Sequence, residues 1–185
     1  MNIDTDRINE SRKERKRILF VGRDFERKNG PLTLAAFEIL LQKKSDAELY
    51  IAGPSTLEVT NENIHFLGDI SSEELADYYN LCDVFCMPSK FEAYGLVFIE
   101  ALTYGLPCIG RNAFEMPYFI DDGVTGRLLG NENPNELAEL MYELLTEEAY
   151  YDNVRRKREG YLKEYSWDTV ADRIERIIES DARSV

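Results

Sequence analysis

Histidine and cysteine, two residue types that build many catalytic and metal centres, are scarce in this sequence. Histidine occurs once, at His65, which leaves little for a zinc site or a cysteine–histidine catalytic pair. The three cysteines are an odd number, and no two of them have the Cys-x-x-Cys spacing. We therefore expect Cys82, Cys86 and Cys108 to be buried free thiols in a reducing compartment, and we expect no metal site.

The sequence also shows no segment with the pattern of a membrane span or a secretory signal. No apolar run approaches the roughly 18–20 residues of a membrane span. The N-terminus is polar and charged, unlike a secretory signal, so we expect a cytoplasmic protein. The 185 residues, of which 44% are hydrophobic and 31% charged, suffice for one globular domain with a sizeable core.

Basic residues are few outside the first 30 positions. Residues 1–30 hold nine basic and six acidic residues, whereas the rest of the chain holds 13 basic and 29 acidic ones. An acidic body repels nucleic acid and anionic membranes, so we expect neither as a partner. Residues 1–16 show no apolar periodicity, and we interpret them as a linker or disordered segment rather than a nucleic-acid patch.

Short apolar runs alternate with helical patterns along the chain. Runs typical of buried strands lie at 17–22, 47–52, 63–68, 83–87, 107–110 and 125–129, with helical spacing between and after them. One helix is expected to be capped by Ser71 or Ser72, and another by Asn133 or Asn135. The alternation predicts an α/β fold, a Rossmann-like doubly wound parallel sheet over residues 17–165. A C-terminal helix follows within residues 166–185.

The stretch from Asp83 to Gly110 has the pattern strand, acidic loop, helix, strand. Neither the Gly-x-Gly-x-x-Gly fingerprint nor a P-loop follows the first strand. Free backbone N–H groups near Gly95 and Leu96, at the start of the helix, are a natural seat for a phosphate. Glu100 lies about a turn and a half further on and can reach hydroxyl groups of the same ligand. The stretch predicts a pocket for a phosphorylated, hydroxyl-rich ligand.

Three segments resemble a known family. They are VGRDFERKNG (21–30), PSKFEAYGLVFIEALTYGLPCIG (88–110) and DDGVTGRLL (121–129), and they follow one another at fitting distances. Together they resemble the C-terminal, donor-binding domain of a family 4 (glycogen-synthase-like) retaining GT-B glycosyltransferase. The resemblance implies that the sheet is one half of a GT-B fold.

The resemblance assigns roles to the cations of the first segment. Arg23 and Lys28 would hold the diphosphate of a nucleotide-sugar donor and stabilise it as it leaves, because the departing group gathers negative charge. The backbone N–H groups of Gly95 and Leu96 would contact the same phosphates. The alternative for Arg23 and Lys28 is an ordinary solvated loop.

The resemblance also assigns the two glutamates of the second segment. Glu100 would accept hydrogen bonds from the ribose hydroxyls, and its alternative is a solvent-facing helix residue. Glu92 would lie near the donor sugar as a base, a nucleophile or an electrostatic stabiliser, and its alternative is a loop carboxylate. The loop Gly68–Ile70 would cradle the nucleobase.

The implied function is donor binding in a retaining, metal-independent hexosyltransferase. Its substrate would be a nucleoside-diphosphate sugar such as a UDP- or GDP-sugar, its acceptor a hydroxyl group, and it would need no cofactor. The N-terminal acceptor domain of such enzymes is missing from these residues, so we expect the chain to be inactive alone. A nucleotide-sugar epimerase and a non-catalytic or regulatory GT-B-like domain are the alternatives.

Some residues depart from the family pattern or carry a structural interpretation. Where the family often has Gly-Gly-x-Pro-Glu, facing the sugar and acceptor cleft, this chain has Phe114–Tyr118 without the glycines.

Ser89 is expected to form a local turn hydrogen bond. Four tyrosines are expected to serve mainly in packing: Tyr78, Tyr79, Tyr94 and Tyr104.

Overall fold

A computed structural model describes residue 8 and residues 15–53 and 60–182. Most of the expected linker, residues 1–16, therefore lies outside the described residues. The strands are β1 (Arg17–Val21), β2 (Glu48–Ala52), β3 (Ile64–Gly68), β4 (Val84–Cys86), β5 (Cys108–Arg111) and β6 (Gly126–Leu129). The helices are α1 (Gly30–Leu41), α2 (Ser72–Leu81), α3 (Leu96–Thr103), α4 (Met116–Phe119), α5 (Pro134–Thr146), α6 (Glu148–Glu164) and α7 (Trp167–Ala182).

The strands form one parallel sheet in the order β3-β2-β1-β4-β5-β6. Each strand is within one residue of its predicted ends, because apolar runs bounded by turn residues mark buried strands well. The chain first winds outward from β1 to β3 and then continues on the other side of β1 with β4. The predicted doubly wound fold is confirmed, and its switch point, where ligands bind in such sheets, lies between β1 and β4.

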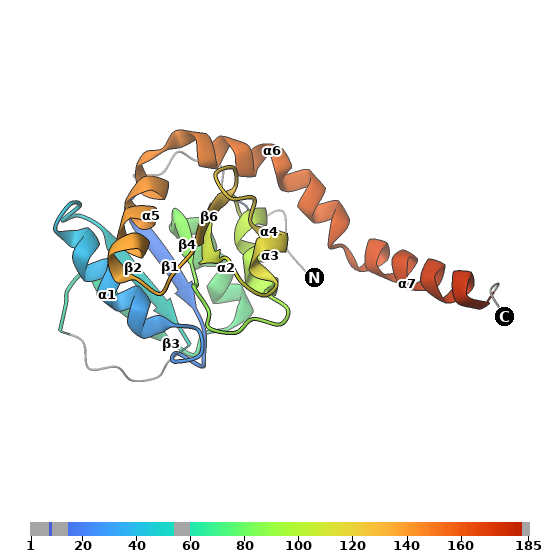
Figure 1. Ribbon diagram of the computed structural model, residues 1–185, viewed down its shortest axis with the longest axis horizontal. Helices are drawn as coiled ribbons and strands as arrows, with labels where there is room; N and C mark the ends of the chain where they lie inside the picture. The colour runs from blue at the N-terminus through green and yellow to red at the C-terminus, as the bar shows by residue number, and fades with distance from the viewer. Residues whose placement is uncertain (1–7, 9–14, 54–59, 183–185) are drawn as a thin grey trace.

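Helices cover both faces of the sheet (Figure 1). On one face α1 packs beside α5, and on the other α3 packs beside α6. The core consists of the strand side chains and the inward helix faces, with an edge-to-face contact of Phe85 on β4 and Phe98 on α3, at 5.3 Å between ring centroids. The three cysteines are buried and free, as predicted.

Local signals at the helix ends place two of the caps. Ser71 caps α2 and forms a reciprocal capping box with Glu74, whose carboxylate accepts from the Ser71 backbone N–H at 2.8 Å. Asn133 caps α5 and accepts from the backbone N–H of Asn135. In both cases the first of the two predicted candidates is the cap.

The C-terminal helix α7 projects away from the sheet (Figure 1). Its apolar side chains Ile174, Ile177 and Ile178 are all more than half exposed. In the described part of the chain, no helix is long and apolar enough to cross a membrane.

Gly126 offers a direct test of the sheet's second half. A Cβ at this position would lie 1.9 Å from the carbonyl oxygen of Cys108, the neighbouring backbone in β5. We expect Gly126→Ala to force β5 and β6 apart and to lower the free energy of unfolding by about 3 kcal/mol. Urea unfolding followed by circular dichroism measures this change.

Gly160 is the matched control, because it lies on α6 with open space around its Cα. Gly160→Ala should raise the free energy of unfolding by about 0.5–1 kcal/mol through its helix propensity. Equal effects of the two substitutions would contradict the pairing of β5 with β6.

Candidate functional site

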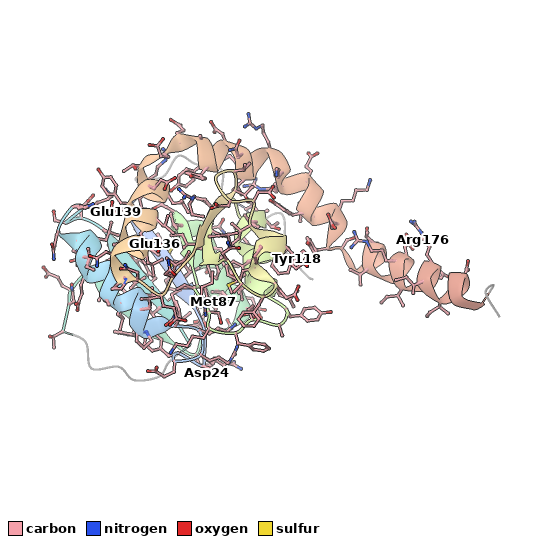
Figure 2. The ribbon with its side chains drawn as sticks, in the orientation of Figure 1. Asp24, Met87, Tyr118, Glu136, Glu139 and Arg176 are labelled. Carbon is pink, nitrogen blue, oxygen red and sulfur yellow. The ribbon has the colours of Figure 1, made fainter. Side chains whose placement is uncertain are left out.

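The candidate site is built from the two loops at the switch point. They are residues 22–29, which follow β1, and residues 87–95, which follow β4. Figure 2 places Asp24 of the first loop at the end of the sheet toward which β1 runs. Gly22 is required here, because a Cβ at this position would lie 2.7 Å from Cγ of Lys28. The missing side chain lets Lys28 cross the end of β1 toward the second loop.

A set of hydrogen bonds joins the two loops. The backbone N–H of Lys90 donates to the carbonyl of Arg27 at 2.9 Å, and the Arg27 guanidinium donates to the carbonyl of Phe91 at 3.0 Å. Asp24 orients Arg27 by accepting from its Nε at 3.0 Å. The hydroxyl of Ser89 donates to the same Phe91 carbonyl at 2.7 Å, so the predicted turn role of Ser89 is confirmed. The backbone around position 92 is therefore fixed from both sides.

Glu92 and Lys28 form a buried ion pair across these loops. Lys28 Nζ donates to Glu92 Oε2, and only 8% of Glu92 is exposed. The other carboxylate oxygen accepts from the backbone N–H of Gly95 at 3.1 Å. Burial alone would raise the pKa of Glu92, but these bonds outweigh burial and hold the pKa below its ordinary value. Glu92 is therefore ionised at neutral pH.

The N–H of Gly95 is not free, so that part of the sequence interpretation was wrong. Gly95 is the N-cap of α3 and has a left-handed backbone, with φ at 54°. Glu92 is three residues earlier and folds back onto this helix N-terminus, where an anion is favourable. The protein's own carboxylate thus occupies the expected anion seat, and contacts of Gly95 and Leu96 with a phosphate stay a prediction.

Glu100 has a partner inside the chain. The hydroxyl of Tyr79 donates to Glu100 Oε2 at 3.1 Å, and the Tyr79 ring stacks on Tyr104 at 5.3 Å between centroids. Burial raises the pKa of Glu100, and the bond from Tyr79 only partly opposes this. Sequence reasoning expected a carboxylate in need of a partner and missed Tyr79. The packing roles predicted for Tyr79 and Tyr104 are confirmed, since both are buried.

Arg23 turns away from Lys28 and toward the loop after β3. Its guanidinium pairs with Asp69 at 2.8 Å, and its side chain is 80% exposed. Arg23 and Asp69 flank a pocket of about 230 Å³ at the ends of β1, β2 and β3. Gly53 lines this pocket, and its lack of a side chain lets the backbone approach Gly22, since a Cβ there would lie 2.5 Å from the Gly22 backbone. The structure therefore separates the predicted cations, with Lys28 beside Glu92 and Arg23 beside the loop Gly68–Ile70.

Exposed aromatic side chains surround the second loop, and sequence reasoning missed them. Phe91 contacts Phe114 edge-to-face at 5.1 Å between ring centroids, and each is about half exposed. Tyr118, on α4, and Tyr94 are 79% and 75% exposed, so the packing role expected for Tyr94 was wrong. Phe114 has φ at 56°, a left-handed conformation that costs a residue with a side chain about 1–2 kcal/mol. The replacement of the family's glycines by Phe114–Tyr118 was the sequence signal that could have pointed to these aromatic residues.

Two other features complete the surroundings. Arg111 links the second loop to the chain after β6, because its guanidinium contacts the carbonyl of Lys90 at 3.4 Å and Glu132 at 3.0 Å. An apolar pocket of about 290 Å³ lies between α3, α4 and the start of α7, and it includes Tyr94 and Phe119. Within the described ranges, no three His, Cys, Asp or Glu side chains gather closely enough to hold a metal ion.

The geometry agrees with what the comparison with known proteins finds. Residues 2–161 match the family described as "Glycosyl transferases group 1". The chain belongs to this family. The suspected relationship to the C-terminal domain of family 4-like GT-B enzymes is confirmed, and the glycosyl transferase assignment holds at the level of the family.

Curated relatives are longer than this chain. An uncharacterized 41.2 kDa protein in the cps region of Klebsiella pneumoniae is 38% identical over 142 residues, covering 72% of this chain and 38% of that protein. A phosphatidyl-myo-inositol mannosyltransferase of Mycobacterium leprae is 28% identical over 178 residues, covering 91% of this chain and 48% of that enzyme. The chain thus spans less than half the length of these relatives.

Solved structures confirm the fold. TarM superposes with a TM-score of 0.78 at 18% identity, over 91% of this chain and 36% of TarM. The pneumococcal O-GlcNAc transferase GtfA, solved with UDP and GlcNAc, gives 0.73 at 18% identity, over 90% of this chain and 36% of GtfA. The C-terminal domain of LpcC from Francisella tularensis gives 0.72 at 19% identity, over 89% of this chain and 98% of that domain.

The raised pKa of Glu100 predicts a substitution that stabilises the chain. Because the folded state holds this proton more tightly than the unfolded state, its contribution to stability is present below the ordinary pKa of about 4.5 and is lost as pH rises through the folded pKa. Glu100→Gln can still accept from Tyr79 but carries no charge. We expect it to raise the melting temperature at pH 7, with the difference disappearing below about pH 4.

Glu74 is the matched control with the opposite sign. Its bonds with Ser71 lower its pKa, so its contribution is present above the ordinary value and is lost as pH falls. Glu74→Gln should lower the melting temperature at pH 7 and have no effect at low pH. A destabilising Glu100→Gln at pH 7 would show that the Glu100 carboxylate is better compensated than its burial indicates.

Proposed function

We propose that this chain is the donor-binding half of a retaining glycosyltransferase. The whole enzyme would transfer a hexosyl group from a nucleoside-diphosphate sugar to an acceptor hydroxyl. The observation that carries the proposal is the Lys28–Glu92 pair, which sets a cation and an ionised carboxylate side by side at the switch point of a group 1 glycosyltransferase fold. A diphosphate and the sugar attached to it need these two charges next to each other.

The cations fit the leaving group. Lys28 offers a positive charge beside the N-terminus of α3, and Arg23 offers a second, mostly exposed one beside the pocket of about 230 Å³. A departing diphosphate gathers negative charge, which both side chains stabilise. Because Arg23 and Lys28 supply this charge themselves, the proposed reaction is metal-independent and needs no cofactor.

The state of Glu92 narrows its role. Its lowered pKa keeps the carboxylate ionised at neutral pH, which does not suit a general acid. An ionised carboxylate stabilises the positive charge that develops on a sugar ring as its leaving group departs. We assign Glu92 to this electrostatic task, with the sugar bound next to it.

Glu100 and the pocket beside Arg23 fit the nucleoside. The half-buried Glu100 carboxylate accepts from Tyr79 at Oε2 and has capacity for further hydrogen bonds, which the ribose hydroxyls would supply. The base would then enter the pocket lined by Gly22, Gly53, Asp69 and Ile70. The likeness to GtfA, which was solved with UDP and GlcNAc, supports a nucleotide such as UDP as the ligand to test.

The acceptor domain belongs to the part of such enzymes that these residues do not include. The relatives are more than twice as long as the matched share, which supports a second domain in the working enzyme. The exposed isoleucines of α7 would pack against that domain. Because closure of both halves excludes water from the reaction, the chain alone should bind donor and transfer little or no sugar.

Donor affinity tests the site. Lys28→Ala and Glu100→Ala each remove a charged hydrogen-bonding group, so we expect each to weaken UDP binding by about 1.5–3 kcal/mol, or roughly 10- to 150-fold. Isothermal titration of the chain with UDP, GDP and ADP measures the affinities.

Lys43→Ala and Glu139→Ala are the controls, because these residues form an exposed ion pair. Figure 2 places Glu139 on α5, away from the edge where Asp24 lies. Both controls should bind UDP as the wild type does. The absence of heat with all three nucleotides, or unchanged affinity in both site variants, would refute the proposed donor site.

A further inference from the structure

Four exposed aromatic side chains lie on the loop that carries Glu92 and on the two segments nearest to it in the fold. This set, the aromatic rim, consists of Phe91, Tyr94, Phe114 and Tyr118, and all four are between 49% and 79% exposed. They come from three neighbouring segments, namely the loop after β4, the loop after β5 and the helix α4. Phe91 directly precedes Glu92 in the chain. The rim therefore borders the place where the donor sugar would react.

The backbone under the rim is fixed. The carbonyl of Phe91 accepts from both Arg27 and Ser89, and the carbonyl of Lys90 accepts from Arg111. The rings of Phe91 and Phe114 meet edge-to-face, and each stays about half exposed and open to contact with a ligand. Their exposure is therefore a property of an ordered surface.

Phe114 keeps a strained backbone without the burial that would offset it. Its φ of 56° lies in the region that glycine or asparagine adopts readily, yet the position holds a bulky ring that is 49% exposed. Backbone strain of this kind persists only where the surrounding structure imposes it, and it clusters at functional sites.

We propose that the aromatic rim stacks against an uncharged sugar ring of the acceptor, so that the acceptor is a glycan. This assignment rests on the proposed function. The negative face of an aromatic ring attracts the polarised C–H groups of a sugar, and the Tyr94 and Tyr118 hydroxyls add hydrogen-bonding capacity. The four rim side chains are themselves uncharged, which favours stacking contact with an uncharged ring.

Direct binding tests the rim. The chain, labelled with ¹³C on the phenylalanine and tyrosine rings, is titrated by NMR with uncharged oligosaccharides of glucose, mannose, galactose and N-acetylglucosamine. We expect at least one oligosaccharide to shift the ring signals of Phe91 and Phe114 in a saturable manner. If none shifts them, the proposal is refuted.

Two variants separate a binding role from a packing role. Phe91→Ala and Phe114→Gly should each weaken oligosaccharide binding by about five- to tenfold, the effect of one lost ring contact. Phe114→Gly also relieves the left-handed strain, so its melting temperature should equal or exceed that of the wild type. Tyr142→Ala, which removes a partly exposed ring on α5, is the matched control and should bind as the wild type does. A lower melting temperature of Phe114→Gly with unchanged sugar binding would refute the proposal.

Two further measurements test whether the rim binds lipid instead of sugar, and whether the donor site fails independently of the rim. Vesicles of phosphatidylcholine and phosphatidylglycerol should leave the ring signals unchanged, and a shift with vesicles but not with sugars would overturn the glycan assignment. UDP affinity should be the same in both rim variants. A chain that binds oligosaccharides at the rim but no nucleotide would refute the donor site while leaving the rim as a sugar site.

Discussion

The ion pair of Lys28 and Glu92 is the interaction on which the site depends. Burying two charges is expensive unless further hydrogen bonds complete them, so such a pair is a weak source of stability. Here the Gly95 N–H completes Glu92, and Gly22 gives Lys28 its path across the strand end. The bonds from Arg27 to the second loop keep both partners in register. The pair therefore adds little to stability, but its surrounding contacts hold the two charges in a fixed arrangement.

The two glutamates of the site differ in electrostatic environment although only eight positions separate them. The pKa of Glu92 is lowered because a cation and a helix N-terminus face it, whereas the pKa of the half-buried Glu100, which accepts from the neutral phenol of Tyr79, is raised by desolvation. The first is suited to a reacting centre that gains positive charge. The second is suited to neutral hydroxyl groups. The division between sugar and nucleoside in the proposed function follows from these environments.

Sequence reasoning recovered what local patterns determine. Apolar runs located each strand to within one residue, and the Ser71 and Asn133 caps were among the candidates. Contacts between segments that are far apart in the sequence could not be predicted from local patterns. The bond from Tyr79 to Glu100 requires α2 to lie against α3, and the exposure of Tyr94 depends on how the second loop meets α4. The hydrogen bond from the Gly95 N–H to Glu92 is local in sequence, but it depends on the left-handed backbone of Gly95. Glycine can adopt that conformation but does not have to, so the sequence alone did not predict it.

The occupied anion seat has a thermodynamic consequence. A phosphate that reaches Lys28 and the start of α3 competes with the carboxylate already bound there, so binding exchanges one anion for another. The favourable energy of the new contacts is reduced by the loss of the old ones. The affinity measured for such a phosphate therefore reports the difference between the two sets of contacts rather than the full strength of the new ones.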